Sequence, residues 1–433
     1  MNTSENSNKN EPYPDVLPFL DEEDFFSSEI WPIFTAFLIG PLVGISIAAF
    51  KWGIPKIAEL LIGLPFNQTF VFVSSLIIGS LIMGLFLNFV PLISGPGIGD
   101  AALTIVEKKG QGPWYWWPFK LLGTILCVAT GGGGLVGPSF FTGMAAGIFC
   151  SHLLGLKEKA KRQTMALLGA GAGVGAVLLA PIGGTLVGVE ALAYKKGQGQ
   201  LALYHTVAAI LTSLIAFLTT GALTGFDPVL SLSHSLPQIT SASALLHILI
   251  AAFVGAVMAK LYVGIFRNIG NLWKGWAPLW LQPALGAILA IPVVIFLSGG
   301  YSSALQPFEI GRPGLAPLQD ALLGKLGLLA LASLTVGKAL DVSLRSGSGG
   351  SVGIFGPAMW VGGMGAAMIG FLPGFENSPL LVVAGITAGI TAALEVPMAG
   401  IVIVLEILGR QAITPAIIGG VIGALIWRIW DKA

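Results

Sequence analysis

This sequence is short of charge. Asp, Glu, Lys and Arg make up only 10% of its 433 residues, whereas a soluble globular protein carries about 25%. The composition therefore excludes an ordinary soluble domain. The net charge of +1 and the lack of a long basic run also argue against nucleic-acid binding.

Residues that carry out catalysis or bind metals are equally scarce. The four histidines have no HExxH or comparable spacing, and Ser139 and Ser348 lie among glycines without forming GxSxG. The two cysteines, Cys127 and Cys150, lie in apolar stretches without CxxC spacing, which favours a packing role. The sequence predicts no enzyme, no metal site and no cofactor.

Apolar residues and glycine are abundant. The chain is 55% hydrophobic, with 60 glycines and a mean hydropathy of +0.85. Apolar runs cover nearly everything after residue 30, which predicts an all-α polytopic membrane protein forming one bundle. Several runs are too short or too long for one crossing, so broken and tilted helices are expected. The runs lie at about 31–50, 53–64, 69–93, 115–130, 135–155, 164–192, 201–225, 243–265, 276–298, 321–343, 352–372, 379–408 and 412–430.

The N-terminal segment, 1–30, differs from the rest of the chain. It holds eight of the 21 acidic residues and one lysine, which predicts an acidic, flexible tail. The basic start and early apolar core of a signal peptide are missing. Basic residues gather in a few connections, such as 157–162, which therefore face the cytoplasm. We expect a multi-pass protein of the plasma (inner) membrane with both termini cytoplasmic.

The chain contains an internal repeat. GPSFFTG at 137–143 resembles GPAMWVG at 356–362, and APIGGTLVGVE at 180–190 resembles VPMAGIVIVLE at 396–406. Both matches occur in the same order and at nearly the same spacing, which predicts two homologous halves. The halves span about 31–225 and 243–430. Glu190 and Glu406 end the second pair of segments, where capping or pairing is at least as good an interpretation as ion handling.

Glycine-rich stretches precede both Gly-Pro pairs, at 131–138 and 347–357, and a third stretch, SGPGIGD, lies at 94–100. Proline fits the first turn of a helix and glycine leaves backbone N–H groups exposed, so these stretches predict helix N-termini. Each N-terminus carries about half a positive charge. Two of them converging within a membrane favour an anion site. Close helix packing is the alternative for any single stretch.

At these residues the sequence resembles the CLC family of chloride channels and proton-coupled chloride exchangers. The resemblance covers about 31–430 and is strongest at KALDVSLRSGSGGSVGIFGP, residues 338–357, which is similar to the family's GxFxP region. It implies a CLC-like inverted repeat, a homodimer with one pore per subunit, contact with membrane lipid, and chloride or another small anion as substrate. The residues it places around the anion, mainly through their backbone, are Gly95, Pro96, Gly97, Ile98, Gly134, Leu135, Val136, Gly137, Gly353, Ile354, Phe355 and Gly356.

The sequence differs from the family at positions where the family has an ionisable or hydroxyl side chain. The family's GREGP or GKEGP motif supplies a gating glutamate, but here it reads GLVGP with Val136 at that position. Pro96 stands where the family's GSGIP motif has serine, and Ala191 corresponds to the inner proton-handling glutamate. The resemblance also implies that the last helix with its pore tyrosine and the cytoplasmic CBS domains are missing, since the chain stops at Ala433.

These departures predict a passive pathway. A valine can neither carry a proton nor occupy an anion site, so we expect a passive anion channel or uniporter, for chloride above all, without proton coupling. The alternatives are a transporter of another anion and a nonconducting family member. An intramembrane enzyme is disfavoured.

Charges within apolar runs are candidate pathway residues, namely Lys120, Lys338, Arg345 and Glu395. Lys120 and Lys338 are expected near the cytoplasmic mouth, where they attract anions or simply extend to the interface. Arg345 either pairs with Asp341, four residues earlier, or lines the pathway.

Overall fold

The computed structural model describes residues 31–131, 133–193, 203–232, 235–239, 241–273, 275–297, 315–375 and 378–431. Over these ranges the chain is helical, and its β-structure there is one isolated bridge. The acidic tail predicted for residues 1–30 lies outside the described residues. Five of the described helices are long and apolar enough to cross a membrane.

The helices follow the same order in each half of the described chain. The first half contains α2 (Trp31–Ile62), α3 (Gln68–Phe89), α4 (Ile98–Val106), α5 (Trp116–Gly131), α6 (Val136–Leu153), α7 (Lys159–Leu178), α8 (Pro181–Ala193) and α9 (Leu203–Thr224). The second contains α10 (Ala242–Leu272), α11 (Gln282–Leu297), α12 (Ala316–Leu322), α13 (Leu328–Gly347), α14 (Phe355–Met368), α15 (Pro379–Leu394), α16 (Pro397–Leu408) and α17 (Ile413–Trp430). Short 3-10 turns lie at Pro91–Ile93, Ile369–Phe371 and Arg410–Ala412.

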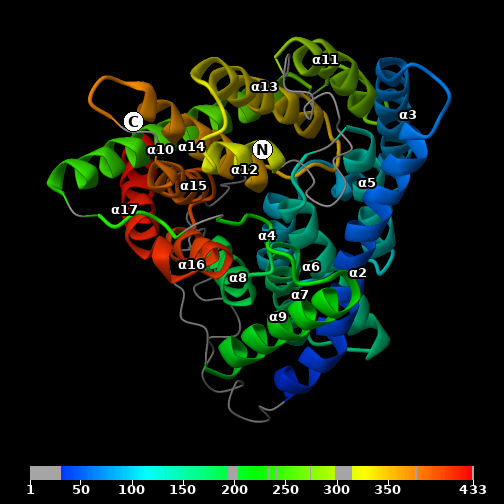
Figure 1. Ribbon diagram of the computed structural model, residues 1–433. Coiled ribbons are helices and arrows are strands. Elements are labelled where there is room, and N and C mark those ends of the chain that lie inside the picture. The colour runs from blue at the N-terminus through cyan, green and yellow to red at the C-terminus, as the bar shows by residue number, and fades with distance from the viewer. Residues whose placement is uncertain are drawn as a thin grey trace, which may run out of the picture.

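The two sets of helices also pack alike. Each helix from α10 to α17 begins at a nearly constant sequence distance from its counterpart in α2 to α9. Helix α6 packs on α7 as α14 packs on α15, and α2 packs on α9 as α10 packs on α17. Figure 1 shows the two sets side by side, with α8 and α16 in contact between them.

Glycines let the innermost helices approach backbone to backbone. A Cβ on Gly143 of α6 would collide with the carbonyl of Gly169 of α7. The equivalent contact in the second half is between Gly362 of α14 and Gly385 of α15. Small residues at such contacts are how helices pack closely in a membrane. For these glycines the packing interpretation holds, and it explains much of the chain's high glycine content.

Two long apolar runs are each split into two helices, as expected of runs that are too long for one crossing. The run 164–192 divides between α7 and α8, and the run 379–408 divides between α15 and α16. The first helix of each pair ends at a residue in the left-handed conformation, Leu179 with φ +56° and Glu395 with φ +66°. A proline then starts the next helix.

Other boundaries differ from the prediction. The runs 31–50 and 53–64 form the single helix α2, which continues through Pro41 and Pro55. The short helices α4 and α12 fall largely between the predicted runs, because nine and seven residues are too few to give a long apolar stretch.

Candidate functional site

The two halves are joined at one pair of equivalent glycines. The N–H of Gly353 donates to the carbonyl of Gly134 at 2.7 Å, and the two residues form an isolated antiparallel bridge. A Cβ on Gly134 would lie 2.5 Å from the Gly353 oxygen, and one on Gly353 would lie 2.9 Å from the Gly134 oxygen. Glycine is therefore required on both sides for this approach.

Helices α6 and α14 begin directly after this bridge. Their N-cap residues, Leu135 and Ile354, make no side-chain capping hydrogen bond. Each helix has its proline in the first turn, at Pro138 and Pro357, as the Gly-Pro pairs predict. The positive ends of two helix dipoles thus lie close together without a carboxylate cap.

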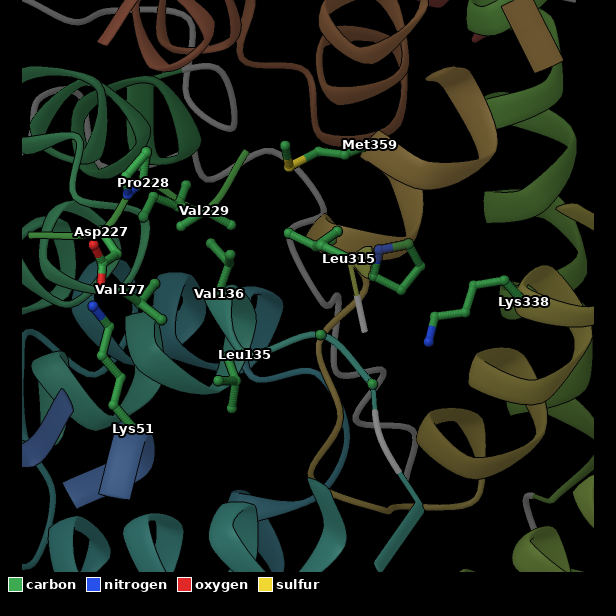
Figure 2. A pocket seen from close by; sticks show the side chains of 15 residues that line it. Lys51, Leu135, Val136, Val177, Asp227, Pro228, Val229, Leu315, Lys338 and Met359 are labelled. Atoms are coloured by element: carbon green, nitrogen blue, oxygen red, sulfur yellow. The ribbon is translucent and has the colours of Figure 1, made fainter. Parts of the chain in front are cut away.

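A cavity of about 100 Å³ opens beside these helix starts (Figure 2). Leu135 and Val136 line it from the start of α6, and Gly356, Pro357 and Met359 line it from the start of α14. A water molecule occupies about 30 Å³ of liquid, so the cavity has room for a small anion with a few waters. Val136 is 4% exposed, and its side chain borders the cavity where the CLC motif has its glutamate.

Two lysines and one aspartate bring charge to the cavity. Lys338 of α13 reaches in from one side, and its Nζ lies 5.0 Å from the centroid of the Trp360 ring. Lys51 of α2 and Asp227, in the connection after α9, lie on the other side and point toward one another in Figure 2. Lys338 thus lies on the side of the cavity opposite Lys51 and Asp227.

The predicted residues Gly95, Pro96, Gly97 and Ile98 form the approach to α4. Gly95 and Gly97 have positive φ, +63° and +86°, and Gly97 is the N-cap of the helix. A Cβ on Gly137 would meet the carbonyl of Pro96, so this turn touches the first turn of α6. The turn does not line the cavity beside Val136.

Lys120 stabilises this turn. It does not lie at an exposed mouth of the pathway. It is completely buried, and its Nζ donates to the carbonyls of Ile93 and Gly95 at 2.8 and 3.0 Å. The burial of Lys120 does not fit its expected place at the cytoplasmic mouth or at the interface, and Lys338 lines the cavity beside α6 whereas Lys120 does not. An inverted repeat explains this separation, because it directs equivalent residues toward opposite faces.

Arg345 is paired with Asp341. Its Nε and Nη2 donate to the two carboxylate oxygens at 2.7 and 2.8 Å, and both side chains are buried. Arg345 does not line the cavity. Of the two interpretations of this arginine, the structure supports the ion pair.

Glu395 and Ala191 also lie away from the cavity. Glu395 ends α15 and is half-buried near Lys260, Arg267 and Asp431, while Lys260 and Asp431 form an ion pair of 2.8 Å. Ala191 lies on α8 and packs against the core. Of the residues predicted at the starts of α6 and α14, the cavity is lined by Gly134, Leu135, Val136 and Gly356. Its lining does not include Gly137, Gly353, Ile354, Phe355, Glu395 or Ala191.

The repeat-related glutamates cap each other's helices. Glu190 of α8 accepts from the N–H groups of Met398 and Ala399 at the start of α16, at 3.0 and 2.8 Å. Glu406 of α16 accepts from Ile182 and Gly183 at the start of α8, at 3.0 and 2.7 Å. The capping interpretation is therefore confirmed, in a reciprocal form that links the halves.

Sequence reasoning missed Lys51, Asp227 and Met359 as residues of the cavity. Lys51 lies between the predicted runs 31–50 and 53–64, which the structure joins into α2, and a charge between two apolar runs could have marked it. Asp227 follows the last helix of the first half in a stretch without helical pattern, and Met359 lies two residues after a predicted Gly-Pro. These three residues come together only because elements that are far apart in the sequence pack against one another.

Comparison with known proteins places the chain in a family. The model of the voltage gated chloride channel family matches residues 152–428. An uncharacterized protein of Methanocaldococcus jannaschii is 26% identical over 344 residues, covering 79% of this chain and 82% of its own. The H(+)/Cl(-) exchange transporter ClcA of Vibrio parahaemolyticus is 24% identical over 360 residues, covering 78% and 72%.

Solved structures show the same fold. A slow cyanobacterial Cl-/H+ antiporter has a TM-score of 0.76 at 18% identity, covering 92% of this chain and 94% of its own. A CLC-type fluoride/proton antiporter has a TM-score of 0.74 at 19% identity, covering 92% and 96%. The fold is thus that of the all-α, multi-pass CLC membrane proteins, as the resemblance implies. The family match extends over more than half of the sequence, and the chain belongs to the voltage gated chloride channel family.

Proposed function

We propose that this chain is a passive pathway for a small anion, chloride above all. The observation that carries the proposal is the joint opening of the α6 and α14 N-termini onto one cavity. Both starts lack a side-chain cap, so their N–H groups and helix dipoles favour an anion there. Lys338 adds a positive charge to the same cavity.

Val136 supports a pathway without proton coupling. A carboxylate at the start of α6 would be able to compete with an anion for the N–H groups when ionised and to carry a proton when neutral. The valine side chain does neither. Among the described residues that line the cavity, Asp227 is the one with a carboxyl group, and in Figure 2 it faces Lys51.

Anion uptake tests this proposal. The purified full-length chain would be reconstituted in liposomes with a chloride gradient, and uptake of radiolabelled chloride measured against empty liposomes. The proposal predicts uptake that Val136→Glu reduces at neutral pH. Val136→Leu is the matched control and should leave most of the uptake intact. Absence of uptake by the unaltered chain would favour the nonconducting alternative.

We also propose that the basic connections face the cytoplasm and that the protein resides in the plasma (inner) membrane. The connection after α4 carries Lys108 and Lys109, the one before α7 carries Lys157, and α7 begins at Lys159. These connections lie on the same side of the fold, because Gly110 of the first packs against Arg162 near the start of α7. The positive-inside tendency assigns such a face to the cytoplasm. A cysteine introduced at Gln111 should react with a permeant maleimide and not with an impermeant one added outside intact cells.

A homodimer is the proposed assembly. Apolar side chains of α9 and α17 remain exposed in the single chain, among them Val207, Leu214, Ile417, Val421 and Leu425. Lipid or a second copy would cover them. The mass of the protein in detergent, measured by light scattering with the detergent contribution subtracted, should be twice that of one chain.

A further inference from the structure

A second cavity, unrelated to the one beside Val136, lies where the connection after α4 meets the start of α7. It is an open hollow at the surface, with a volume of about 510 Å³. Its lining is unusual for this charge-poor chain. Lys108, Lys109 and Lys159 line it together with the single acid Glu107.

The three lysines are not paired within the described part of the chain. No carboxylate there lies within 4.0 Å of their ammonium groups, whereas neighbouring Lys161 has a 2.7 Å ion pair with Glu158. The Lys108 ammonium lies 5.9 Å from the centroid of the Trp116 ring, which forms part of the cavity wall. The cavity is thus lined by three lysines that form no ion pair with a carboxylate, although Glu107 belongs to the same lining.

The wall that carries two of these lysines is held in place. Lys109 has a left-handed φ of +50°, and the next residue, Gly110, packs so closely that a Cβ would lie 2.7 Å from the carbonyl oxygen of Arg162. The Gly110 N–H donates to the Thr104 carbonyl at 3.0 Å. The His152 Nε2 lies 2.7 Å from the Gly112 oxygen. The turn is therefore fixed at both ends, and its lysines are brought beside Lys159 by tertiary contacts.

Apolar side chains border the same region. Trp114 and Tyr115 follow the turn directly and are 54% and 38% exposed. Leu153 and Leu154 follow His152 and are 65% and 49% exposed. Exposed aromatic and aliphatic residues beside clustered lysines are typical of the boundary between lipid headgroups and acyl chains.

We propose that this cavity binds a phosphate-bearing anion, whose phosphate group is held by Lys108, Lys109 and Lys159. Three lysines that line one site offer the charge and donors that a phosphate requires. Glu107 opposes binding, since its carboxylate repels the same group. The phosphate belongs either to the headgroup of an acidic phospholipid, whose acyl chains lie along the apolar border, or to a soluble compound.

Binding to the purified full-length protein tests the proposal. Native mass spectrometry would measure the retention of phosphatidylglycerol against phosphatidylcholine, and calorimetry would measure the affinity for inorganic pyrophosphate. The proposal predicts that the triple variant Lys108→Gln, Lys109→Gln, Lys159→Gln weakens binding at least about tenfold, because each lysine near an anionic group contributes about fivefold. Lys161→Gln, at a neighbouring but paired lysine, should change binding little.

Glu107→Gln distinguishes a binding role from a structural one, because it should strengthen binding. Loss of phosphatidylglycerol retention in the triple variant, with pyrophosphate never bound, identifies a lipid site. Loss of pyrophosphate binding identifies a site for soluble phosphate compounds. The proposal is overturned if the triple variant and Lys161→Gln bind both probes alike, or if phosphatidylcholine is retained as well as phosphatidylglycerol. Equal elution volumes and unfolding temperatures without added probe show that the variants are folded.

Discussion

Gly134 and Gly353 hold equivalent places in the two halves of this chain and are hydrogen-bonded to each other, from the Gly353 N–H to the Gly134 oxygen at 2.7 Å. The bond joins two positions that are far apart in the sequence. The two glycines form an isolated antiparallel bridge. Helices α6 and α14 start on either side of it, so one contact both joins the halves and positions the proposed anion site.

A methyl group added at the contact between Gly134 and Gly353 should abolish anion uptake. Gly353→Ala would bring a Cβ to 2.9 Å from the Pro138 Cδ and the Gly134 oxygen, among rigid backbone atoms. We expect loss of anion uptake, with a lower unfolding temperature. Gly99→Ala is the matched control, because no atom lies within 4 Å of its added Cβ. Full uptake by Gly353→Ala would show that the close approach is dispensable.

The reciprocal caps between α8 and α16 should stabilise the fold. Replacing Glu190 or Glu406 with alanine leaves two N–H groups of the opposite helix without an acceptor. We expect each replacement to cost about 2 kcal/mol, in the range for charged hydrogen bonds and helix caps. Thermal unfolding in detergent measures the effect.

Glu59→Ala is the control for the caps, since Glu59 makes only a surface ion pair of 3.4 Å with Lys56. If both cap variants unfold at the same temperature as this control, the carboxylates do not stabilise the helix starts. A change in anion uptake without a change in stability would point to ion handling instead.

The buried ion pair of Asp341 and Arg345 predicts that losing the aspartate alone lowers stability more than losing both residues. Asp341→Leu alone removes the carboxylate from this buried ion pair and should cost about 3 to 5 kcal/mol. Adding Arg345→Met removes the remaining charge of the pair and should recover much of the loss. Expression level and unfolding temperature give the measurement. A double variant less stable than Asp341→Leu would contradict the predicted recovery.

Lys338 should set the affinity of the pathway for anions. Lys338→Met keeps a long side chain over Trp360 but removes the charge from the cavity. We expect the chloride concentration for half-maximal uptake to rise about tenfold, in proportion to a lost charged contact. Lys325→Met, at a lysine 63% exposed on the surface, is the control. Equal concentration dependence in both variants would remove Lys338 from the pathway.

Sequence reasoning reached the repeat, the helix starts and the missing glutamate, because each has a local pattern. Gly-Pro pairs mark first turns wherever they occur, and the match of 137–143 with 356–362 requires no structure. It did not reach the roles of Lys120 and Arg345. A buried charge has the same appearance in sequence whether it binds carbonyls, pairs with an acid or faces an ion, and tertiary packing decides among these.

The breaks inside 164–192 and 379–408 show a second limit. Leu179 and Glu395 take a left-handed conformation that their side chains do not favour, so these two residues do not mark the breaks in the sequence, although Pro181 and Pro397 do. The reciprocal caps and the following prolines supply the reason for the breaks, and the caps connect residues from opposite halves of the chain. Such contacts are visible only in the folded chain.

Val136→Glu should restore pH sensitivity. An unperturbed glutamate ionises near pH 4.3, so at neutral pH its carboxylate would occupy the N–H groups at the start of α6 and reduce uptake. Below that pKa the neutral side chain should allow uptake to recover. Val136→Gln is the control, because it has similar size and no titration. Uptake should be compared across pH for chloride, nitrate and fluoride.

The central claim is that anions pass without protons. It is tested by reconstituting the unaltered chain in liposomes with a chloride gradient, clamping the membrane potential with valinomycin and potassium, and recording internal pH with a dye. We predict that chloride moves down its gradient while internal pH stays constant. Proton movement against its own gradient, driven by chloride, would contradict the account.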